Sequence, residues 1–303
     1  MTRPRIVLVG PAAPFRGGIA HFSNRLAQAM EEAADVRLVT FTRQYPTLLF
    51  PGETQFEDTK WAFQRQPERM LDSINPLSWL KTGRAIADER PDAVVFVHWL
   101  PFFVPAYLGV LGAMRRRLKA LGAPMAVVSL FLHNIYPHKK FPATKPLMRA
   151  LVGAADRAFT LSEHVTRDAH AMRPGLPLYE GFHPVYDIFQ PAIPPAEARA
   201  VLGLPDGRTL LFFGYIRPYK GLDVLLDAMP EIHRRTGARL IVAGEFYNNE
   251  DELRAKVRAL GLDQGEAPAV RFFSQYIPNE EVHLYFSAAD ALVQPYRRAT
   301  PSG

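Results

Sequence analysis

The chain has 303 residues, a formal net charge of +6 and no cysteine. This length predicts about two domains and is enough to bury hydrophobic cores. The absence of cysteine excludes a disulfide framework and thiolate metal sites, and it fits a reducing cytoplasm. No run of about eighteen uncharged apolar residues is present, so we expect no membrane-spanning helix. The first apolar run is too short for a signal peptide.

The first half of the chain alternates between apolar runs and helical patterns, which predicts repeated strand–helix units. Apolar runs predict strands at residues 5–9, 36–41, 93–97, 125–132 and 158–161. Apolar residues at helical spacing predict helices over residues 19–30, 77–89 and 108–121. Residues 44–75 show neither pattern, and so long an irregular segment inside a domain is often functional.

The turn after the first predicted strand contains Gly17 and Gly18, directly before a predicted helix. Glycines at this place let a ligand approach the free N–H groups of the helix N-terminus. The turn is not a Walker loop, because no Gly-Lys-Ser or Gly-Lys-Thr follows, and it lacks the Gly-x-Gly-x-x-Gly pattern of dinucleotide sites.

The second half repeats the alternation, with strands expected at residues 210–213, 239–243, 270–273 and 291–294. Helices are expected at 222–229, at 251–260 and from residue 279 onwards. Three prolines between residues 191 and 195 predict a stiff hinge. We therefore place two domains at 1–190 and 191–303.

The turn after the strand at 210–213 carries the most specific pattern. It reads Gly-Tyr-Ile-Arg-Pro-Tyr-Lys-Gly from Gly214, and places Arg217 and Lys220 between a buried strand and a helix. Open α/β sheets bind ligands at such turns. The helix N-terminus, a guanidinium fork and an ammonium group all favour phosphate. Both cations could instead be solvated loop residues, but the order of strand, glycine, cations and helix favours a phosphate site.

This turn resembles the donor-phosphate loop of retaining GT-B glycosyltransferases of the GT4 type. The resemblance implies two Rossmann-like, parallel-sheet α/β domains that face a cleft. The first domain would lie on the acceptor side, with acceptor contacts in residues 44–75, and the second would bind a nucleotide-sugar. Arg217 and Lys220 would hold the donor diphosphate and neutralise its charge as it departs. Neither a metal nor another cofactor is expected beside the nucleotide-diphosphate-sugar.

The same resemblance assigns further residues. Gly17 and Gly18 match the family's Gly-Gly-Ile/Val loop, which faces the cleft. His133 matches the histidine that contacts the transferred sugar, although a histidine at a strand end could also be a satisfied core residue. His133 and His138 lack the glutamate of zinc proteases, so no metal site is expected there. The remaining donor contacts implied are Gly214, Glu245, Tyr276, Ile277, Thr300, Ser302 and Gly303.

The end of the sequence departs from the family's usual pattern. Ala299 stands where most members have a glutamate, and the sequence better resembles a subgroup with Pro-Tyr-x-x-Ala-Thr-x-Ser-Gly. The standard carboxylate contact to the sugar is therefore in doubt. Because Gly303 falls where a helix should begin, we expect an incomplete second domain, in a C-terminally truncated or naturally shortened protein.

Arg115, Arg116, Arg117 and Lys119 lie near the end of the helix predicted at 108–121. They suit peripheral contact with anionic membrane lipid, or they form an ordinary solvated helix end, where cations are favoured. The basic residues are otherwise scattered and no nucleic-acid-binding module is recognisable, so no nucleic acid is expected as a partner.

We therefore predict a retaining glycosyltransferase, cytoplasmic and at the inner face of the membrane, that builds a cell-surface polysaccharide or glycolipid. Two alternatives stay open. An NAD-dependent dehydrogenase would need the glycine fingerprint that is missing here. A non-catalytic nucleotide-binding or interaction protein on a GT-B scaffold is compatible with Ala299 and the shortened end.

Overall fold

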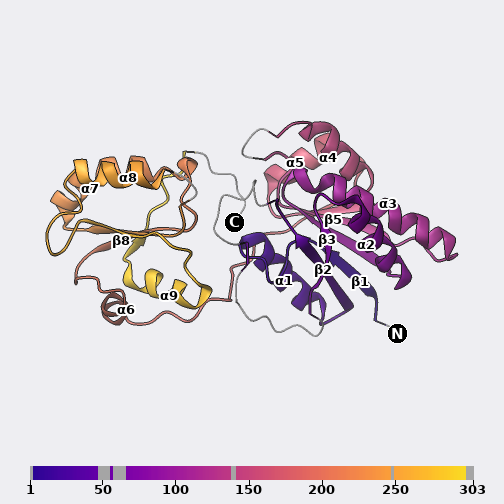
Figure 1. Ribbon diagram of the computed structural model, residues 1–303, viewed down its shortest axis with the longest axis horizontal. Coiled ribbons are helices and arrows are strands. Elements are labelled where there is room, and N and C mark those ends of the chain that lie inside the picture. Colours follow the sequence, from indigo (N-terminus) through magenta and orange to yellow (C-terminus); the bar gives the residue numbers. More distant parts are fainter. Residues whose placement is uncertain (1–2, 47–54, 57–65, 138–140, 247–248, 298–303) are drawn as a thin grey trace. The chain divides into compact units, whose positions relative to one another are not determined.

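The computed structural model describes residues 3–46, 55–56, 66–137, 141–246 and 249–297 (Figure 1). The chain divides into two compact units, and the main division falls between Pro184 and Val185. Each unit is built around its own sheet and its own hydrophobic core. The domain limits of 1–190 and 191–303 remain a prediction from the sequence.

The first unit contains a seven-stranded sheet in the order β3-β2-β1-β4-β5-β6-β7, and every neighbouring pair is parallel. Its central strands are rich in valine, leucine and phenylalanine because both faces are covered by other elements. The strands are β1 (Arg5–Val9), β2 (Asp35–Arg43), β3 (Glu68–Asp72), β4 (Ala93–His98), β5 (Val127–Leu132), β6 (Arg157–Thr160) and β7 (Leu178–Glu180).

Helices connect these strands, and sequence signals mark where several of them begin. Asn75 caps one helix by accepting a hydrogen bond from the amide of Leu77, and Ser162 caps another by accepting from Val165. The helices of the first unit are α1 (Gly18–Met30), α2 (Pro76–Asp88), α3 (Val104–Ala120), α4 (Thr144–Gly153) and α5 (Glu163–Met172), with a 3-10 turn, η2 (Pro101–Phe103), before α3.

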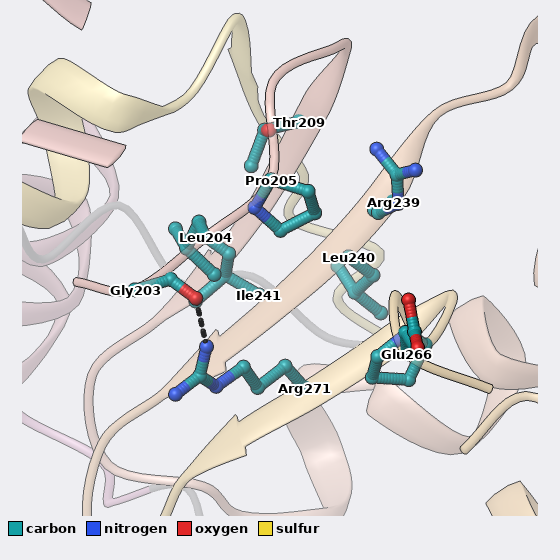
Figure 2. Close-up of a pocket in the computed structure, with 10 residues that line it drawn as sticks. Gly203, Leu204, Pro205, Thr209, Arg239, Leu240, Ile241, Glu266 and Arg271 are labelled. Carbon is teal, nitrogen blue, oxygen red and sulfur yellow. Dashed lines mark hydrogen bonds between the residues drawn. The ribbon is translucent and has the colours of Figure 1, made fainter. Parts of the chain in front are cut away.

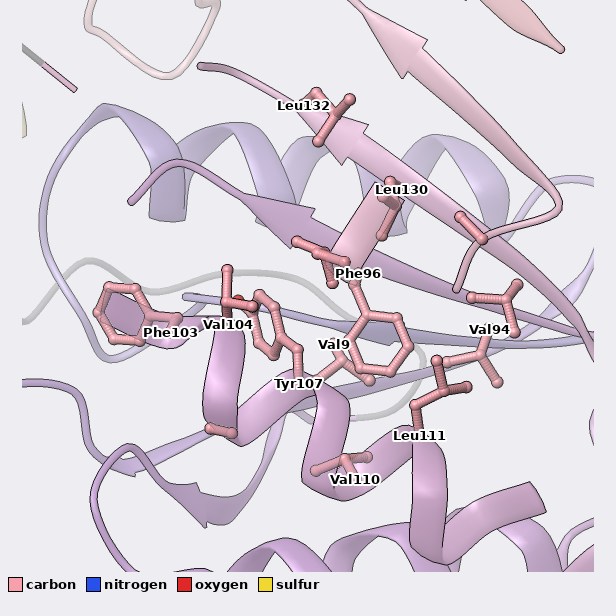
Figure 3. Close-up of a cluster of buried hydrophobic side chains, with 14 of the residues drawn as sticks. Val9, Val94, Phe96, Phe103, Val104, Tyr107, Val110, Leu111, Leu130 and Leu132 are labelled. Carbon is pink, nitrogen blue, oxygen red and sulfur yellow. The ribbon is translucent and has the colours of Figure 1, made fainter. Parts of the chain in front are cut away.

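Helix α3 supplies much of the core on one face of the first sheet (Figure 3). Tyr107 and Val110 pack there with Phe96 and Leu130, and all four side chains are fully buried. The Tyr107 hydroxyl donates a 2.8 Å hydrogen bond to the carbonyl of Val97. The ring is therefore buried without leaving its polar end unsatisfied. Each such side chain contributes about 1.5–3 kcal/mol through burial.

The second unit contains a four-stranded parallel sheet in the order β10-β9-β8-β11. Helices α7 and α8 cover one face, and α6 and α9 cover the other (Figure 1). The strands are β8 (Thr209–Phe213), β9 (Arg239–Ala243), β10 (Val270–Phe273) and β11 (Ala291–Leu292). The helices are α6 (Pro195–Val201), α7 (Leu222–Thr236), α8 (Glu250–Ala259) and α9 (Asn279–Ala288), with a 3-10 turn, η3 (Pro218–Lys220), before α7.

Two sequence expectations need correction. Residues 44–75 were expected to be irregular throughout, but they contain β3, in which only Leu71 is fully buried. Its charged residues pair with β2 through Arg37–Glu68 and Arg43–Asp72, so tertiary contacts rather than an apolar run form the strand. The last strand, β11, is also shorter than the run at 291–294 suggested. Within the described ranges, no helix combines the length and apolarity needed to cross a membrane.

Candidate functional site

The carboxyl ends of the four strands in the second unit share one edge of the sheet, because all four strands are parallel. The predicted donor residues that the structure describes in this unit follow these strand ends. Gly214 follows β8, Glu245 follows β9, and Tyr276 and Ile277 follow β10. Thr300, Ser302 and Gly303, as well as Ala299, lie outside the described residues.

Backbone contacts hold the turn that carries Arg217 and Lys220. Ile216 is buried, and its amide donates a 2.9 Å hydrogen bond to the carbonyl of Glu245. The Lys220 amide donates to the Arg217 carbonyl, also at 2.9 Å. Gly221 has a φ of 75°, and a Cβ atom there would lie 2.1 Å from the Pro295 carbonyl oxygen. Only glycine therefore fits between this turn and the segment after β11.

The turn concentrates positive charge in a partly buried place. Burial, and secondly the neighbouring Arg217, lower the pKa of Lys220 to about 8. The Lys220 ammonium lies 3.5 Å from the carbonyl oxygen of Phe213, and among the described residues no carboxylate forms an ion pair with it. Arg217 is exposed and lies over the ring of Tyr215, 6.0 Å from its centroid. Such a turn favours an anion that would compensate both cations.

Gly214, Glu245 and Tyr276 have contacts at this turn or at the strand end beside it. The Gly214 amide donates a 3.0 Å hydrogen bond to Ala243, the last residue of β9. Glu245 and Ile277 are buried, and the Glu245 carbonyl accepts the hydrogen bond from Ile216. The ring centroids of Tyr276 and Tyr215 are 6.5 Å apart. Tyr215 was not singled out in the sequence, although it directly follows the strand-ending glycine.

His133 lies in the first unit, directly after β5. Its amide donates a 2.9 Å hydrogen bond to the carbonyl of His98, at the end of the neighbouring strand β4. The rings of Phe22, Phe131 and His183 lie around the imidazole, with centroids 4.8, 5.6 and 6.4 Å away. The side chain is 3% exposed, and its Nε2 has no hydrogen-bond partner among the described residues.

Burial, with a smaller contribution from His183, lowers the pKa of His133 to about 3. The pKa of His98 is likewise lowered to about 3, by its complete burial and then by His133. Both imidazoles are therefore neutral near pH 7. Neither ring nitrogen of His98 has a hydrogen-bond partner among the described residues. His98 directly follows the strand predicted at residues 93–97, and no role was predicted for it from the sequence.

Gly17 and Gly18 lie where the sequence placed them, at the N-terminus of α1. Gly17 is the N-cap residue with a φ of 107°, and Gly18 is the first helical residue. The Gly17 carbonyl accepts hydrogen bonds from the amides of Ala20 and His21. Like His133, both glycines belong to the first unit.

Tyr296 and Arg297 also contact the turn of the second unit, and no role was predicted for them from the sequence. Arg297 forms an ion pair with Asp223 in the first turn of α7, and its amide donates to the Tyr219 carbonyl at 2.9 Å. The sequence feature that could have indicated this contact is the Pro-Tyr pair after the last strand. Its contact with the turn depends on β11 pairing directly with β8.

A separate pocket of about 260 Å³ lies where β8 and β9 begin, at the amino ends of these strands (Figure 2). Arg239 and Arg271 line it. Arg271 donates a 2.5 Å hydrogen bond to the Gly203 carbonyl, and Arg239 donates to the carbonyl of Asp206 at 3.1 Å. Both arginines thus bind loop carbonyls, and the pocket is distinct from the strand ends that carry Arg217 and Lys220.

Two protein-family descriptions match most of the chain. A "Glycosyl transferase 4-like domain" matches residues 17–176, and "Glycosyl transferases group 1" matches residues 207–303. The first match covers more than half of the sequence. The two matches fall on either side of the junction between the compact units.

The individual proteins to which the chain is similar include named glycosyltransferases. The chain is 38% identical over 108 residues to a D-inositol 3-phosphate glycosyltransferase of Frankia alni, covering 33% of this chain and 26% of that protein. It is 30% identical over 203 residues to a GDP-mannose-dependent alpha-(1-6)-phosphatidylinositol monomannoside mannosyltransferase of Mycolicibacterium smegmatis, covering 65% and 50%. The matches thus span half or less of these two relatives.

Solved structures resemble the chain over nearly all its length. Sucrose-phosphate synthase from Thermosynechococcus elongatus superposes with a TM-score of 0.67 at 18% identity, covering 97% of this chain and 76% of that one. The Anabaena protein HepE, in complex with UDP and glucose, also has a TM-score of 0.67, at 14% identity, covering 98% and 76%. At such identities the likeness shows the fold alone. The family matches and this fold together show that the chain belongs to the GT4-type glycosyltransferases of GT-B fold.

Proposed function

We propose that this protein transfers a sugar from a nucleoside-diphosphate-sugar to an acceptor hydroxyl, with retention of anomeric configuration. The observation that carries the proposal is the partly buried turn holding Arg217 and Lys220 at the N-terminus of α7. Its two cations and the free helical N–H groups match the charge of a diphosphate. The family membership supplies the class of reaction.

In this reaction the bond between the sugar's anomeric carbon and the diphosphate oxygen breaks, and negative charge grows on the diphosphate. Arg217 and Lys220 would stabilise that charge most strongly in the transition state. We propose that these two cations and the helix N-terminus serve in place of a divalent metal. The donor is then a co-substrate, and no other cofactor takes part.

His133 would act on the transferred sugar rather than on the diphosphate. Because its pKa is lowered to about 3, the imidazole is neutral and can exchange a hydrogen bond with a sugar hydroxyl without a net charge. Its Nε2 is buried without a partner among the described residues. The surrounding rings of Phe22 and Phe131 fix the imidazole plane. We propose that His133 orients the sugar at the reacting carbon.

The names of the relatives suggest the substrate class. One is a D-inositol 3-phosphate glycosyltransferase, and another is a GDP-mannose-dependent mannosyltransferase that acts on a phosphatidylinositol monomannoside. We propose a polyol or glycolipid acceptor, used at the cytoplasmic side in the synthesis of a cell-surface polysaccharide or glycolipid. The remaining donor contacts would be made by Gly17, Gly18, Gly214, Glu245, Tyr276, Ile277, Thr300, Ser302 and Gly303.

We also propose that α3 makes peripheral contact with anionic lipid. Arg115, Arg116, Arg117 and Lys119 are all exposed on the last turns of this helix. Arg116 and Arg117 line a groove of about 520 Å³ between α2 and α3. Asp88 also lines the groove and pairs with Arg117 at 2.7 Å, which leaves an excess of positive charge. Cations gathered on the last turns of one helix suit an anionic lipid layer.

The membrane contact is tested by flotation with vesicles rich in anionic lipid. Changing Arg115, Arg116 and Arg117 together to Gln should release the protein from the floating fraction. The control changes Arg234, Arg235 and Arg258 to Gln, removing the same charge from exposed sites of the second unit. If both variants float as the unchanged protein does, or if that protein never floats, the proposal is wrong.

The donor site is tested by calorimetric titration with UDP and with GDP. The Arg217→Ala, Lys220→Ala double variant should lose at least about tenfold in affinity, because each charge-assisted hydrogen bond is worth about 1.5–3 kcal/mol. The matched control is Arg234→Ala with Arg235→Ala, at the far end of α7, which removes equal charge. Undiminished binding by the double variant would remove the phosphate role.

A further inference from the structure

The segment that follows β11 packs directly on the turn of η3. The Arg297 amide donates a 2.9 Å hydrogen bond to the carbonyl of Tyr219. The rings of Tyr219 and Tyr296 meet edge to face, with centroids 6.0 Å apart. The Arg297 guanidinium pairs with the carboxylate of Asp223. Several independent contacts therefore fix Tyr296 beside the turn.

Tyr296 also meets the cation of this turn. The Lys220 ammonium lies over the Tyr296 ring, 5.7 Å from its centroid. This is within the range of about 6 Å over which the negative face of an aromatic ring attracts a cation. Lys220 and Tyr296 are both partly buried, so less water screens the attraction.

The charged groups near Lys220 show how far the protein itself compensates the charge of the ammonium. Burial, and secondly repulsion by Arg217 in the same turn, lower the pKa of the ammonium. Asp223 on α7 is the nearby acid of the helix, but Arg297 pairs with it. Glu245 comes from the β9 end and contacts the turn through its carbonyl, which Ile216 binds. The Phe213 carbonyl at 3.5 Å is only a weak acceptor for the ammonium.

We propose that Tyr296 is a positioning residue whose ring face holds the Lys220 ammonium in place for the donor diphosphate. The inference rests on the proposed function, because it assigns Lys220 to that diphosphate. The ring attracts the charged amine without donating a competing negative charge. The ring thus offsets part of the free energy that is lost when the charged ammonium is buried without a bound donor. The N–H groups of the ammonium remain able to bind phosphate oxygens.

The test compares an aromatic and a non-aromatic replacement. Tyr296→Phe keeps the ring, while Tyr296→Leu removes it. UDP affinity, measured by calorimetry, should stay within about twofold for Tyr296→Phe and fall about three- to tenfold for Tyr296→Leu. Tyr179→Leu, an exposed tyrosine of the first unit, is the control and should leave UDP affinity unchanged.

A second measurement reports on the ammonium itself and needs no nucleotide. Lysines are methylated with ¹³C, and the pKa of Lys220 is followed by NMR, with its signal assigned by its loss in Lys220→Arg. In Tyr296→Leu the pKa should fall below about 8, because an attraction for the charged form has been removed. In Tyr296→Phe it should stay where it is.

The outcomes separate this inference from the proposed function. If the unchanged protein binds neither UDP nor GDP, the proposed function fails, whereas the NMR titration still decides the ring's action on Lys220. If Tyr296→Leu keeps full affinity and an unchanged Lys220 pKa, the inference is overturned. If Tyr296→Phe loses as much as Tyr296→Leu, the hydroxyl rather than the ring acts, which also overturns it. Tyr296→Met decides the question should Tyr296→Leu fail to fold.

Discussion

Gly244 and Gly214, which directly follow the neighbouring strands β9 and β8, are in backbone contact. A Cβ atom at Gly244 would lie 2.1 Å from the Gly214 carbonyl oxygen, and the φ of Gly244 is 143°. The Gly244 amide donates a 3.0 Å hydrogen bond to the Phe273 carbonyl, which continues the ladder toward β10. The two glycines thus bring three strand ends together where the candidate donor residues lie.

Gly244→Ala should therefore destabilise the second unit by about 2–4 kcal/mol, because overlap with backbone adds to the strain of an unfavourable φ. Urea unfolding measures the change. Gly153→Ala is the control, since it lies in α4 with no atom within 4 Å of an added Cβ. The control should change stability by less than about 1 kcal/mol. Equal stabilities of the two variants would contradict the close contact.

Acid should destabilise the first unit through its two buried histidines. The pKa values of His98 and His133 are lowered to about 3, from an ordinary 6.5. Between these limits the unfolded chain binds more protons than the folded one, so stability falls as the pH drops below about 6.5. Each such group contributes a slope of up to about 1.4 kcal/mol per pH unit.

Urea unfolding of the first unit as a function of pH measures this slope. His98→Phe should lower this slope by up to about 1.4 kcal/mol per pH unit, whatever the variant's stability at neutral pH. A slope in His98→Phe equal to that of the unchanged protein would show that His98 takes up protons in the folded state.

Nucleotide binding should be coupled to proton uptake at Lys220. Its pKa is lowered to about 8, and a bound diphosphate would raise it, because an opposite charge favours the ammonium form. Near pH 8 UDP binding should therefore take up protons, and affinity should fall as the pH rises above that value. Well below pH 8 the ammonium is already formed, so little uptake should remain.

Calorimetry in two buffers with different ionisation enthalpies measures this uptake, since the observed heat then differs between buffers. Lys220→Arg should remove the difference, because arginine stays charged throughout this range. A difference that persists in Lys220→Arg would assign the proton to another group.

Replacing His133 should separate sugar transfer from nucleotide binding. If His133 contacts only the transferred sugar, His133→Ala should lower the transfer rate by roughly a hundredfold, as expected for a lost positioning contact. UDP affinity should change by less than about twofold. Transfer assays and UDP titration measure the two effects, and His170→Ala controls for the loss of a histidine. A parallel loss of UDP affinity would place His133 at the nucleotide instead.

Much of the fold could be predicted because most strands are uninterrupted apolar runs. The bounds of β1, β9 and β10 match the prediction to the residue. The run in β9, Arg-Leu-Ile-Val-Ala, permits little except a buried strand. Strand β3, Glu-Arg-Met-Leu-Asp, could not be predicted, because its charged residues become favourable only when β2 supplies their partners.

The sequence by itself determined the general alternation of strands and helices, without β3, β7, α4 and α6, and the glycine, arginine and lysine of the turn after β8. Local spacing suffices for these features, because an apolar period and a glycine turn need no distant partner. Only the tertiary structure decided that Tyr296 lies over Lys220 and that aromatic rings surround His133. The first contact depends on β11 pairing with β8, two strands far apart in the chain. Side-chain periodicity fixes which face of a strand is buried, but it does not specify that strand's neighbour.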